Sequence, residues 1–411
     1  MPPVDFRSDL IIRWPDPQPS HITLLKQAGI QAVVLAKPEP AFAAAFATVP
    51  EADLRAFPLN QLPANPGPYA ALSSGLWPGI SREPSISGPN VETVSASREP
   101  WVDSNAYSIS YLRALYPKSA PVLAYEANPA AGLGAGRIVP FDTLMLALAE
   151  ARVMGGNYIL SLDPAFRKAL LADDAKAVAA WKKLGVTAKW LAHNKDLFGV
   201  EPPPAITALV EPGRATAEIA NLLFRRNGSP RLIADVPERL PAGTFVLVTT
   251  SMKTPKPEIA ARILELAAVG GVTIVTDDPA WWKSPQLKVV KTQSDRVFYA
   301  LGKGSICAYN RKIVDPSEHA LDVIDLVGHP RRAVRIWNAN ATIPVAAPGV
   351  VHLLNYSGRG RDTQVRIQGV YKSCMWLRPG AAPVNLAAAR RGTTTEVFVP
   401  EPALVSTLRF R

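Results

Sequence analysis

The sequence predicts an α/β protein in three parts: a compact β/α barrel, an open doubly wound α/β domain and a small β-sandwich. Three observations support this fold class. Short apolar runs alternate with helical patterns over residues 9–200, the pattern restarts after a proline-rich linker at 199–205, and helical periodicity disappears from Arg331 onward. At 411 residues the chain is long enough for two or three domains. We therefore expect domains at 1–200, 205–328 and 331–411.

The first part has seven short apolar runs without strict alternation, which is typical of parallel strands covered on both faces. The runs lie at 9–14, 31–36, 54–59, 69–77, 92–96, 121–125 and 158–162, and helical patterns lie at 21–28, 40–48, 104–116, 141–155 and 165–198. Ser20 and Gly29 mark the start and the end of the first helix. Repeated strand–helix units predict a parallel sheet closed into a TIM-like barrel, with any active site at the C-terminal ends of its strands.

The second and third parts differ in their periodicity. Strands at 206–210, 231–234, 244–249 and 272–276 alternate with helices at 215–226 and 257–269, which is the pattern of an open, doubly wound sheet. The last part has only short strands separated by glycine and proline turns, which is typical of a β-sandwich. These strands lie at 350–356, 362–368, 373–377, 394–399 and 404–410.

The net charge of +11 raises the question of a nucleic-acid partner. The densest basic groups, at 225–226, 331–335 and 390–391, are short and far apart in the sequence. This scatter favours a basic surface over a nucleic-acid site. No run of 18 apolar residues occurs, so we expect no membrane span.

The residue types that commonly bind metals and cofactors form no recognisable motif in this sequence. The five histidines are dispersed, and the glycine-rich stretches lack the dinucleotide and phosphate-loop spacings, so we expect no metal and no cofactor. Cys307 and Cys374 lie in apolar strand-like runs and are expected to be buried free thiols. The start lacks the apolar region of a signal peptide, so the protein is expected to be cytoplasmic, or secreted or periplasmic if a signal peptide has been removed.

Five short segments carry a family resemblance. They are Arg98-Glu-Pro-Trp-Val-Asp-Ser-Asn105, Gly155-Gly-Asn-Tyr-Ile-Leu-Ser-Leu-Asp163, Gly270-Gly-Val-Thr-Ile-Val-Thr276, Gly302-Lys-Gly-Ser-Ile306 and Val351-His-Leu-Leu-Asn-Tyr-Ser357. Together with the order of the parts, they resemble the A4-type β-galactosidases and their glycoside-hydrolase-like relatives. In that family a barrel, a glutamine-amidotransferase-like domain and a β-sandwich follow one another. The resemblance implies a glycosidase with a carbohydrate substrate, and it supports the fold more than the activity.

The second domain departs from a true amidotransferase. The turn Val248-Thr-Thr-Ser-Met-Lys253, where the nucleophilic cysteine would stand, has neither a cysteine nor a flanking glycine. We therefore expect this domain to be structural or to serve as the surface of a homo-oligomer.

Glycoside hydrolysis generally needs two carboxyl groups, and in a barrel they project from the C-terminal ends of strands. Glu99 is expected to be the general acid, since a carboxyl buried beside Trp101 would keep its proton. Asp163 is expected to be the nucleophile or base, with Asp103 or Glu126 as substitutes. Expected substrate contacts are Trp77, Trp101, Asn105, Tyr107 and Arg167.

Each of these assignments has a structural alternative. Asp103 and Asp163 precede predicted helices and could equally cap them, and Glu126 fits a solvated loop as well as a catalytic site. The sequence is therefore also compatible with a non-catalytic carbohydrate-binding or assembly protein on a degenerate hydrolase barrel. The charge leaves a polyanion binder as a third hypothesis.

Overall fold

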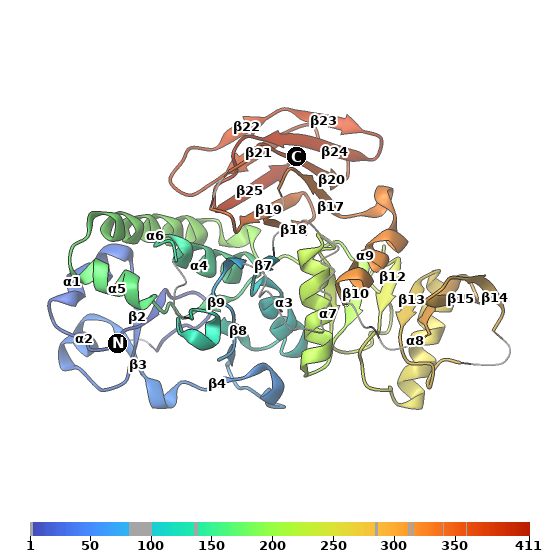
Figure 1. Cartoon of the computed structure of the whole chain (residues 1–411), viewed down its shortest axis with the longest axis horizontal. Coiled ribbons are helices and arrows are strands. Elements are labelled where there is room, and N and C mark those ends of the chain that lie inside the picture. The colour runs from blue at the N-terminus through green and yellow to red at the C-terminus, as the bar shows by residue number, and fades with distance from the viewer. Residues whose placement is uncertain are drawn as a thin grey trace, which may run out of the picture.

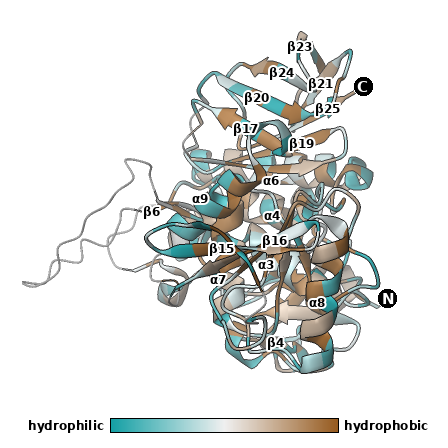
Figure 2. Cartoon of the chain, turned by 90° about the vertical axis from the view of Figure 1, so that its right-hand side faces the viewer, coloured by the Kyte–Doolittle hydropathy of each residue, from teal (hydrophilic) through white to brown (hydrophobic). Residues whose placement is uncertain are grey.

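The computed structural model describes residues 3–81, 101–134, 139–283, 287–310, 313, 316–339, 341–358 and 360–411. Figure 1 shows an N-terminal α/β region beside a second α/β sheet, with a β-sandwich lying above both. The same stacking is visible from the side in Figure 2. None of the helices within these ranges is long and apolar enough to cross a membrane.

The N-terminal region contains an array of seven parallel strands. They pair in the orders β3-β2-β1 and β4-β5-β8-β9, and a bridge between Ile12 and Leu160 joins the two groups. Among the described residues no pairing joins β3 to β4, so a closed barrel is not detected and the predicted TIM barrel is not shown. The strands are β1 (Ile11–Arg13), β2 (Ala32–Leu35), β3 (Ala47–Pro50), β4 (Ala56–Phe57), β5 (Tyr69–Leu72), β8 (Ala120–Leu123) and β9 (Asn157–Tyr158).

Two features of this array differ from the predicted pattern. The helix expected at 40–48 stops early, as α2 (Pro40–Ala45), because Phe46 is extended and the next four residues pair with β2 as β3. The strand expected at 92–96 lies outside the described residues. Its neighbours form a separate antiparallel pair, β6 (Gly79–Ser81) with β7 (Trp101–Asp103).

Helices connect the strands of the array. The first, α1 (His21–Ala28), ends where predicted, because Gly29 takes a left-handed conformation with φ of 83°. The side chain of Ser20 makes no capping hydrogen bond, so the predicted cap is wrong. The single helix expected at 165–198 is broken, since Asp174 caps the start of a second helix. The resulting helices are α5 (Pro164–Leu171) and α6 (Ala175–His193).

The middle region is an open sheet with helices on both faces. Its strand order is β11-β10-β12-β13-β16-β15-β14, with the last two strands antiparallel to their neighbours. Helices α7 and α9 pack on one face and α8 on the other, as the two separate hydrophobic clusters show. The elements are β10 (Ile206–Leu209), α7 (Arg214–Arg225), β11 (Arg231–Ile233), β12 (Val246–Val248), α8 (Pro257–Gly270), β13 (Thr273–Thr276), β14 (Val289–Thr292), β15 (Arg296–Leu301), β16 (Gly304–Tyr309) and α9 (Pro316–Val327).

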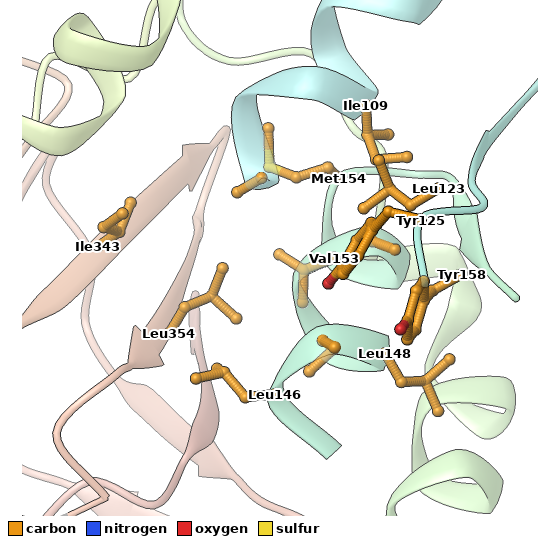
Figure 3. Packing of buried hydrophobic residues seen from close by; sticks show 14 of the residues in the cluster. Ile109, Leu123, Tyr125, Leu146, Leu148, Val153, Met154, Tyr158, Ile343 and Leu354 are labelled. Carbon is orange, nitrogen blue, oxygen red and sulfur yellow. The ribbon is translucent and has the colours of Figure 1, made fainter. Parts of the chain in front are cut away.

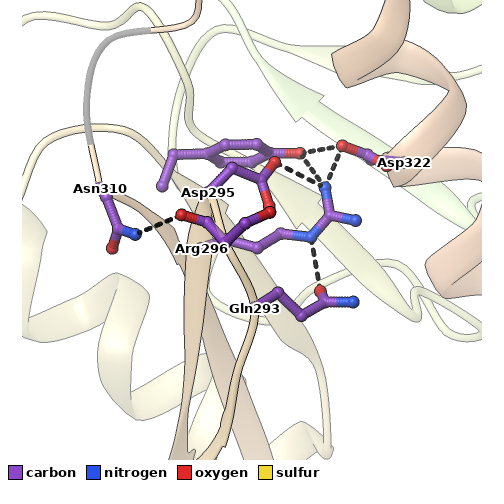
Figure 4. A network of polar contacts seen from close by, with 7 residues as sticks. Gln293, Asp295, Arg296, Asn310 and Asp322 are labelled. Carbon is purple, nitrogen blue, oxygen red and sulfur yellow. Dashed lines mark hydrogen bonds and ion pairs between the residues drawn. The ribbon is translucent and has the colours of Figure 1, made fainter.

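A polar network attaches the β15–β16 hairpin to α9 (Figure 4). The guanidinium of Arg296 donates to Gln293 at 2.8 Å and forms an ion pair with Asp322. The hydroxyl of Tyr309 donates to the same carboxylate at 2.8 Å. The hairpin itself turns at Gly302 and Lys303.

The C-terminal sandwich has two antiparallel sheets. An inner sheet, in the order β18-β19-β25-β21-β22, faces the rest of the molecule, and an outer sheet, β17-β20-β24-β23, lies above it. Both cysteines of the chain are free and buried, as expected. The strands are β17 (Val334–Trp337), β18 (Thr342–Ala347), β19 (Val350–Asn355), β20 (Thr363–Gln368), β21 (Cys374–Leu377), β22 (Val384–Leu386), β23 (Ala388–Arg391), β24 (Thr394–Val399) and β25 (Val405–Phe410).

Helix α4 (Thr143–Val153) joins the sandwich to the array. Ten of its eleven residues are buried, which requires partners on all sides of the helix. Figure 3 shows Ile343 and Leu354 of the inner sheet on one side of it and Tyr125 and Tyr158 of the array on the other. A single hydrophobic cluster therefore runs through all three regions.

Two glycines meet where the chain leaves the N-terminal region. Gly155 follows α4 and Gly199 begins the linker, and both have positive φ values, 84° and 65°. A Cβ atom on Gly155 would lie 2.6 Å from the Cα atom of Gly199. Only glycine allows this approach without displacing backbone.

We expect Gly155→Ala to lower the free energy of unfolding by about 2 kcal/mol or more, because backbone strain and overpacking add. Gly392→Ala is the matched control, since Gly392 also has positive φ (62°) but has no atom within 4 Å of its Cβ position. It should lose only about 1 kcal/mol, from strain alone. Urea denaturation measures both values, and equal losses would contradict the close contact.

Candidate active site

Two hollows open at the C-terminal ends of the array strands, where a site was expected. The α5 hollow, of about 720 Å³, lies between the ends of β1, β2 and β8 and helix α5. The α7 hollow, of about 630 Å³, lies between the ends of β5 and β8, the segment after β7, and helix α7 of the middle region. Glu126 lines both.

Glu126 follows β8 and the two buried residues Ala124 and Tyr125, and its side chain is exposed. Tyr125 is held by stacking on Tyr158, with 4.9 Å between the ring centroids. Because its neighbours are fixed in the core, the backbone of Glu126 is held at the strand edge, and its side chain lines both hollows.

The α5 hollow is lined by charged groups that are partly paired. Arg13 contacts Glu51, with Nε 3.0 Å from Oε2, and also donates to the carbonyl oxygen of Ala124. Arg167 lies over the ring of buried Trp14, with its guanidinium carbon 5.3 Å from the ring centroid. The predicted substrate contact Arg167 is thus placed in the wall of this hollow.

Asp163, the predicted nucleophile or base, lies at the start of α5. Its Oδ1 atom accepts hydrogen bonds from the backbone N–H groups of Ala165 and Phe166, both at 3.0 Å. This geometry is that of a helix N-cap, the structural alternative left open by the sequence.

The segment after β7 forms a wall of the α7 hollow. Helix α3 (Ala106–Leu115) begins after Asn105, so Asp103 lies outside its N-cap position. Asp103 is 8% exposed at the end of β7, and Tyr107 lines the hollow from the first turn of α3. Glu99 lies outside the described residues, and for Trp101 only the backbone is described, in β7.

The other two predicted substrate contacts are buried. Trp77 is 1% exposed, and Asn105 is 2% exposed. The Asn105 amide accepts from the backbone N–H of Leu76 at 2.7 Å and donates to Leu76 O, the Tyr125 hydroxyl and Glu150. Asn105 therefore positions the segments around the hollow.

Glu150, which the sequence did not single out, is the central group of a buried polar cluster. It is fully buried in α4 and accepts from the Asn105 backbone N–H at 3.1 Å and the Asn105 amide at 2.8 Å. The hydroxyls of Ser104 and Tyr356 also donate to it, at 3.3 and 3.0 Å. Burial raises its pKa to about 7, against the opposing effect of these hydrogen bonds.

The α7 hollow also contains a carboxylate that the sequence did not indicate. Glu218 lies on α7, in the middle region, together with Arg214 and Arg225. Helix α7 is fixed against α3, since the Tyr111 hydroxyl donates to the carbonyl oxygen of Glu211 at 2.5 Å. No local signal marks Glu218, because only the packing of two regions brings it to the strand edge.

The turn at 248–253 in the middle region is where an amidotransferase would carry its nucleophilic cysteine. Ser251 does have a positive φ of 61°, and its N–H donates to Asp277 at 2.9 Å. His319, however, bonds the neighbouring Thr250 at 3.0 Å, and both of these side chains are buried. Cys307 lies in β16, which is separated from β12 by one strand, β13, and it is not part of this turn.

The raised pKa of Glu150 leads to a testable pH dependence. The folded chain keeps the proton up to about pH 7, whereas the unfolded chain releases it near 4.5. The free energy of unfolding of the wild type, relative to Glu150→Gln, should therefore fall by about 1.4 kcal/mol per pH unit as the pH rises across this window.

Urea unfolding at intervals from pH 4 to 8 measures this difference. Glu265→Gln is the control, because Glu265 is exposed on α8 and should leave the pH profile parallel to that of the wild type. A difference between wild type and Glu150→Gln that stays constant with pH would contradict the raised pKa.

Comparisons with known proteins bear on the fold. No protein-family model matches the sequence, and no curated protein matches it. Among solved structures the chain is similar to α-L-fucosidase isoenzyme 2 from Paenibacillus thiaminolyticus, with a TM-score of 0.50 and 10% sequence identity.

The similarity covers 74% of this chain and 63% of the fucosidase chain, so this protein spans less than two thirds of that enzyme's length. An α-L-fucosidase is a glycoside hydrolase, and the similarity is one of fold; the relation to A4-type β-galactosidases is not confirmed. This chain is a mixed α/β protein with several sheets and a fold similar to that of the fucosidase.

Proposed function

We propose that this protein is a glycosidase that cleaves glycosidic bonds at the C-terminal edge of the strand array, with Glu126 as one of its carboxyl groups. The observation that carries the proposal is the position of Glu126, which is exposed, lines both hollows and is the third residue after β8, a strand paired on both sides. Strand ends of this kind carry catalytic groups in β/α enzymes. The similarity in fold to a fucosidase supports a carbohydrate substrate.

The second carboxyl group is proposed to be Glu218, which lines the α7 hollow with Glu126. In such a pair one carboxylic acid protonates the leaving oxygen, and the other carboxylate attacks the anomeric carbon or activates water. Glu51 is a weaker candidate, because Arg13 already pairs with it. Glu99, predicted as the general acid from its position beside Trp101, stays as the alternative to Glu126 in that role, and Tyr107 and Arg167 stay as proposed substrate contacts.

A second function, non-catalytic carbohydrate binding, is favoured by one observation. Asp163, the expected nucleophile, uses an oxygen to cap α5. If Asp163 were the required second carboxylate and served only as a cap, the strand edge would bind sugars without cleaving them. A glycosidase would hydrolyse a glycoside and a binding protein would not, so a measurement of hydrolysis distinguishes the two functions.

The test is a screen of aryl-glycosides, including α-L-fucosides, and natural oligosaccharides against the wild type and Glu126→Gln. We expect wild-type turnover and a fall in kcat/KM of about 10²–10⁴ in the variant, because a general acid or base is lost. Glu218→Gln should show a loss of similar size. Glu265→Gln, an exposed change on α8, should retain full activity.

Three outcomes would change the assignment. Absence of turnover with every glycoside, together with measurable sugar binding, would establish the binding protein instead. Full activity in Glu126→Gln with a loss in Glu99→Gln would transfer the role of acid to Glu99. Full activity in both variants would contradict a site at this edge.

A further inference from the structure

The outer sheet of the sandwich has one face turned away from the core. Along β20 the residues alternate between buried and partly exposed, so every second side chain points outward. The inward side chains pack in the sandwich core with those of the inner sheet. Figure 2 places this sheet at the upper end of the molecule, and none of its residues lines either hollow.

The strand register arranges the outward side chains in rows. Trp337 lies opposite Gln364, which lies opposite Phe398, so two aromatic rings flank one amide across three strands. Two strand spacings separate the aromatic residues, about 10 Å. Phe398 is 54% exposed, which is unusual for a phenylalanine and leaves its ring available for contact.

The next row carries arginines. Arg335 lies opposite Arg366, which lies opposite Glu396. Both guanidinium groups lie over the Trp337 ring, with their central carbons 4.7 and 5.0 Å from its centroid. Arg366 also donates to Glu396 at 2.7 Å, and the ring and carboxylate together hold the guanidinium in place.

Arg391, on the edge strand β23, donates to the other oxygen of Glu396 at 3.2 Å. Glu396 can balance only one of the three arginine charges, so the surface is positive. We call the residues Arg335, Trp337, Arg366, Arg391 and Phe398 the arginine face.

We propose that the arginine face binds an acidic polysaccharide through the carboxylates of its uronate units. Its positive charge complements such a chain, and the planar fork of arginine matches a carboxylate with two parallel hydrogen bonds. The exposed ring of Phe398 offers an apolar surface for the C–H face of a sugar.

The composition of the face favours a sugar over DNA. The side-chain oxygen of Gln364 can accept a hydrogen bond from a sugar hydroxyl, whereas the deoxyribose-phosphate backbone has no donor to offer. This surface is separate from the strand edge, so the inference does not depend on the proposed glycosidase activity.

Isothermal titration of the full chain with oligogalacturonate, at low salt, tests the proposal. We expect binding that weakens as the salt concentration rises, and no comparable binding of a neutral galacto-oligosaccharide of the same length. Arg335→Gln combined with Arg391→Gln should weaken the affinity at least about tenfold, through the loss of two charged contacts. Phe398→Ser should also weaken it, and because Phe398 is exposed this variant should fold even if the double variant does not.

Two controls separate this surface from others. Arg409→Gln changes an exposed arginine on β25 of the other sheet and should leave the affinity unchanged. Glu265→Gln, an exposed change on α8 outside both proposed sites, should also bind oligogalacturonate normally.

Three results would overturn the proposal. The first is a wild type that does not bind oligogalacturonate, and the second is unchanged affinity in both face variants. The third is equally tight binding of dextran sulfate or of single-stranded oligothymidylate, which would identify a general polyanion surface.

Discussion

The pairing of Glu150 with Asn105 is the interaction on which the rest of this structure depends. A carboxyl group inside an apolar helix is costly unless its oxygens are hydrogen-bonded. Here the donors come from two distant segments, the turn before α3 and Tyr356 at the end of β19. The cluster can be satisfied only when α4, the array and the sandwich are packed together. The buried cluster therefore stabilises one relative arrangement of α4, the array and the sandwich.

The same pairing determines the geometry of the candidate site. Asn105 connects Glu150 to the Leu76 backbone and to the Tyr125 hydroxyl, and Tyr125 directly precedes Glu126. The segments that form the α7 hollow are thus positioned by a buried network rather than by local loop structure. The opposite wall comes from α7, which is held against α3 by Tyr111. The hollow is formed where the N-terminal and middle regions meet, which explains why its far wall carries a carboxylate from the middle region.

Local sequence patterns predicted a mixed α/β protein, many of its strands and the position of Glu126 beyond a strand end. They failed where tertiary packing decides the outcome. The residues of β3 resemble the end of an alanine-rich helix, and only pairing with β2 makes them a strand. Glu150 stands in an alanine- and leucine-rich helix where one glutamate normally faces solvent, so burial could not be read from its neighbours. Glu218 lies more than ninety residues from Glu126 in sequence, and nothing local links them.

The central claim is that carbohydrate binds at the strand edge around Glu126. The most direct measurement is a crystal structure of the Glu126→Gln variant, which should bind but not cleave, soaked with an oligosaccharide that the wild type cleaves or binds. The account predicts a sugar ring at the junction of the two hollows, with an oxygen within about 3.2 Å of the substituted amide. Sugar density confined to another surface, with the strand edge filled only by water, would contradict it.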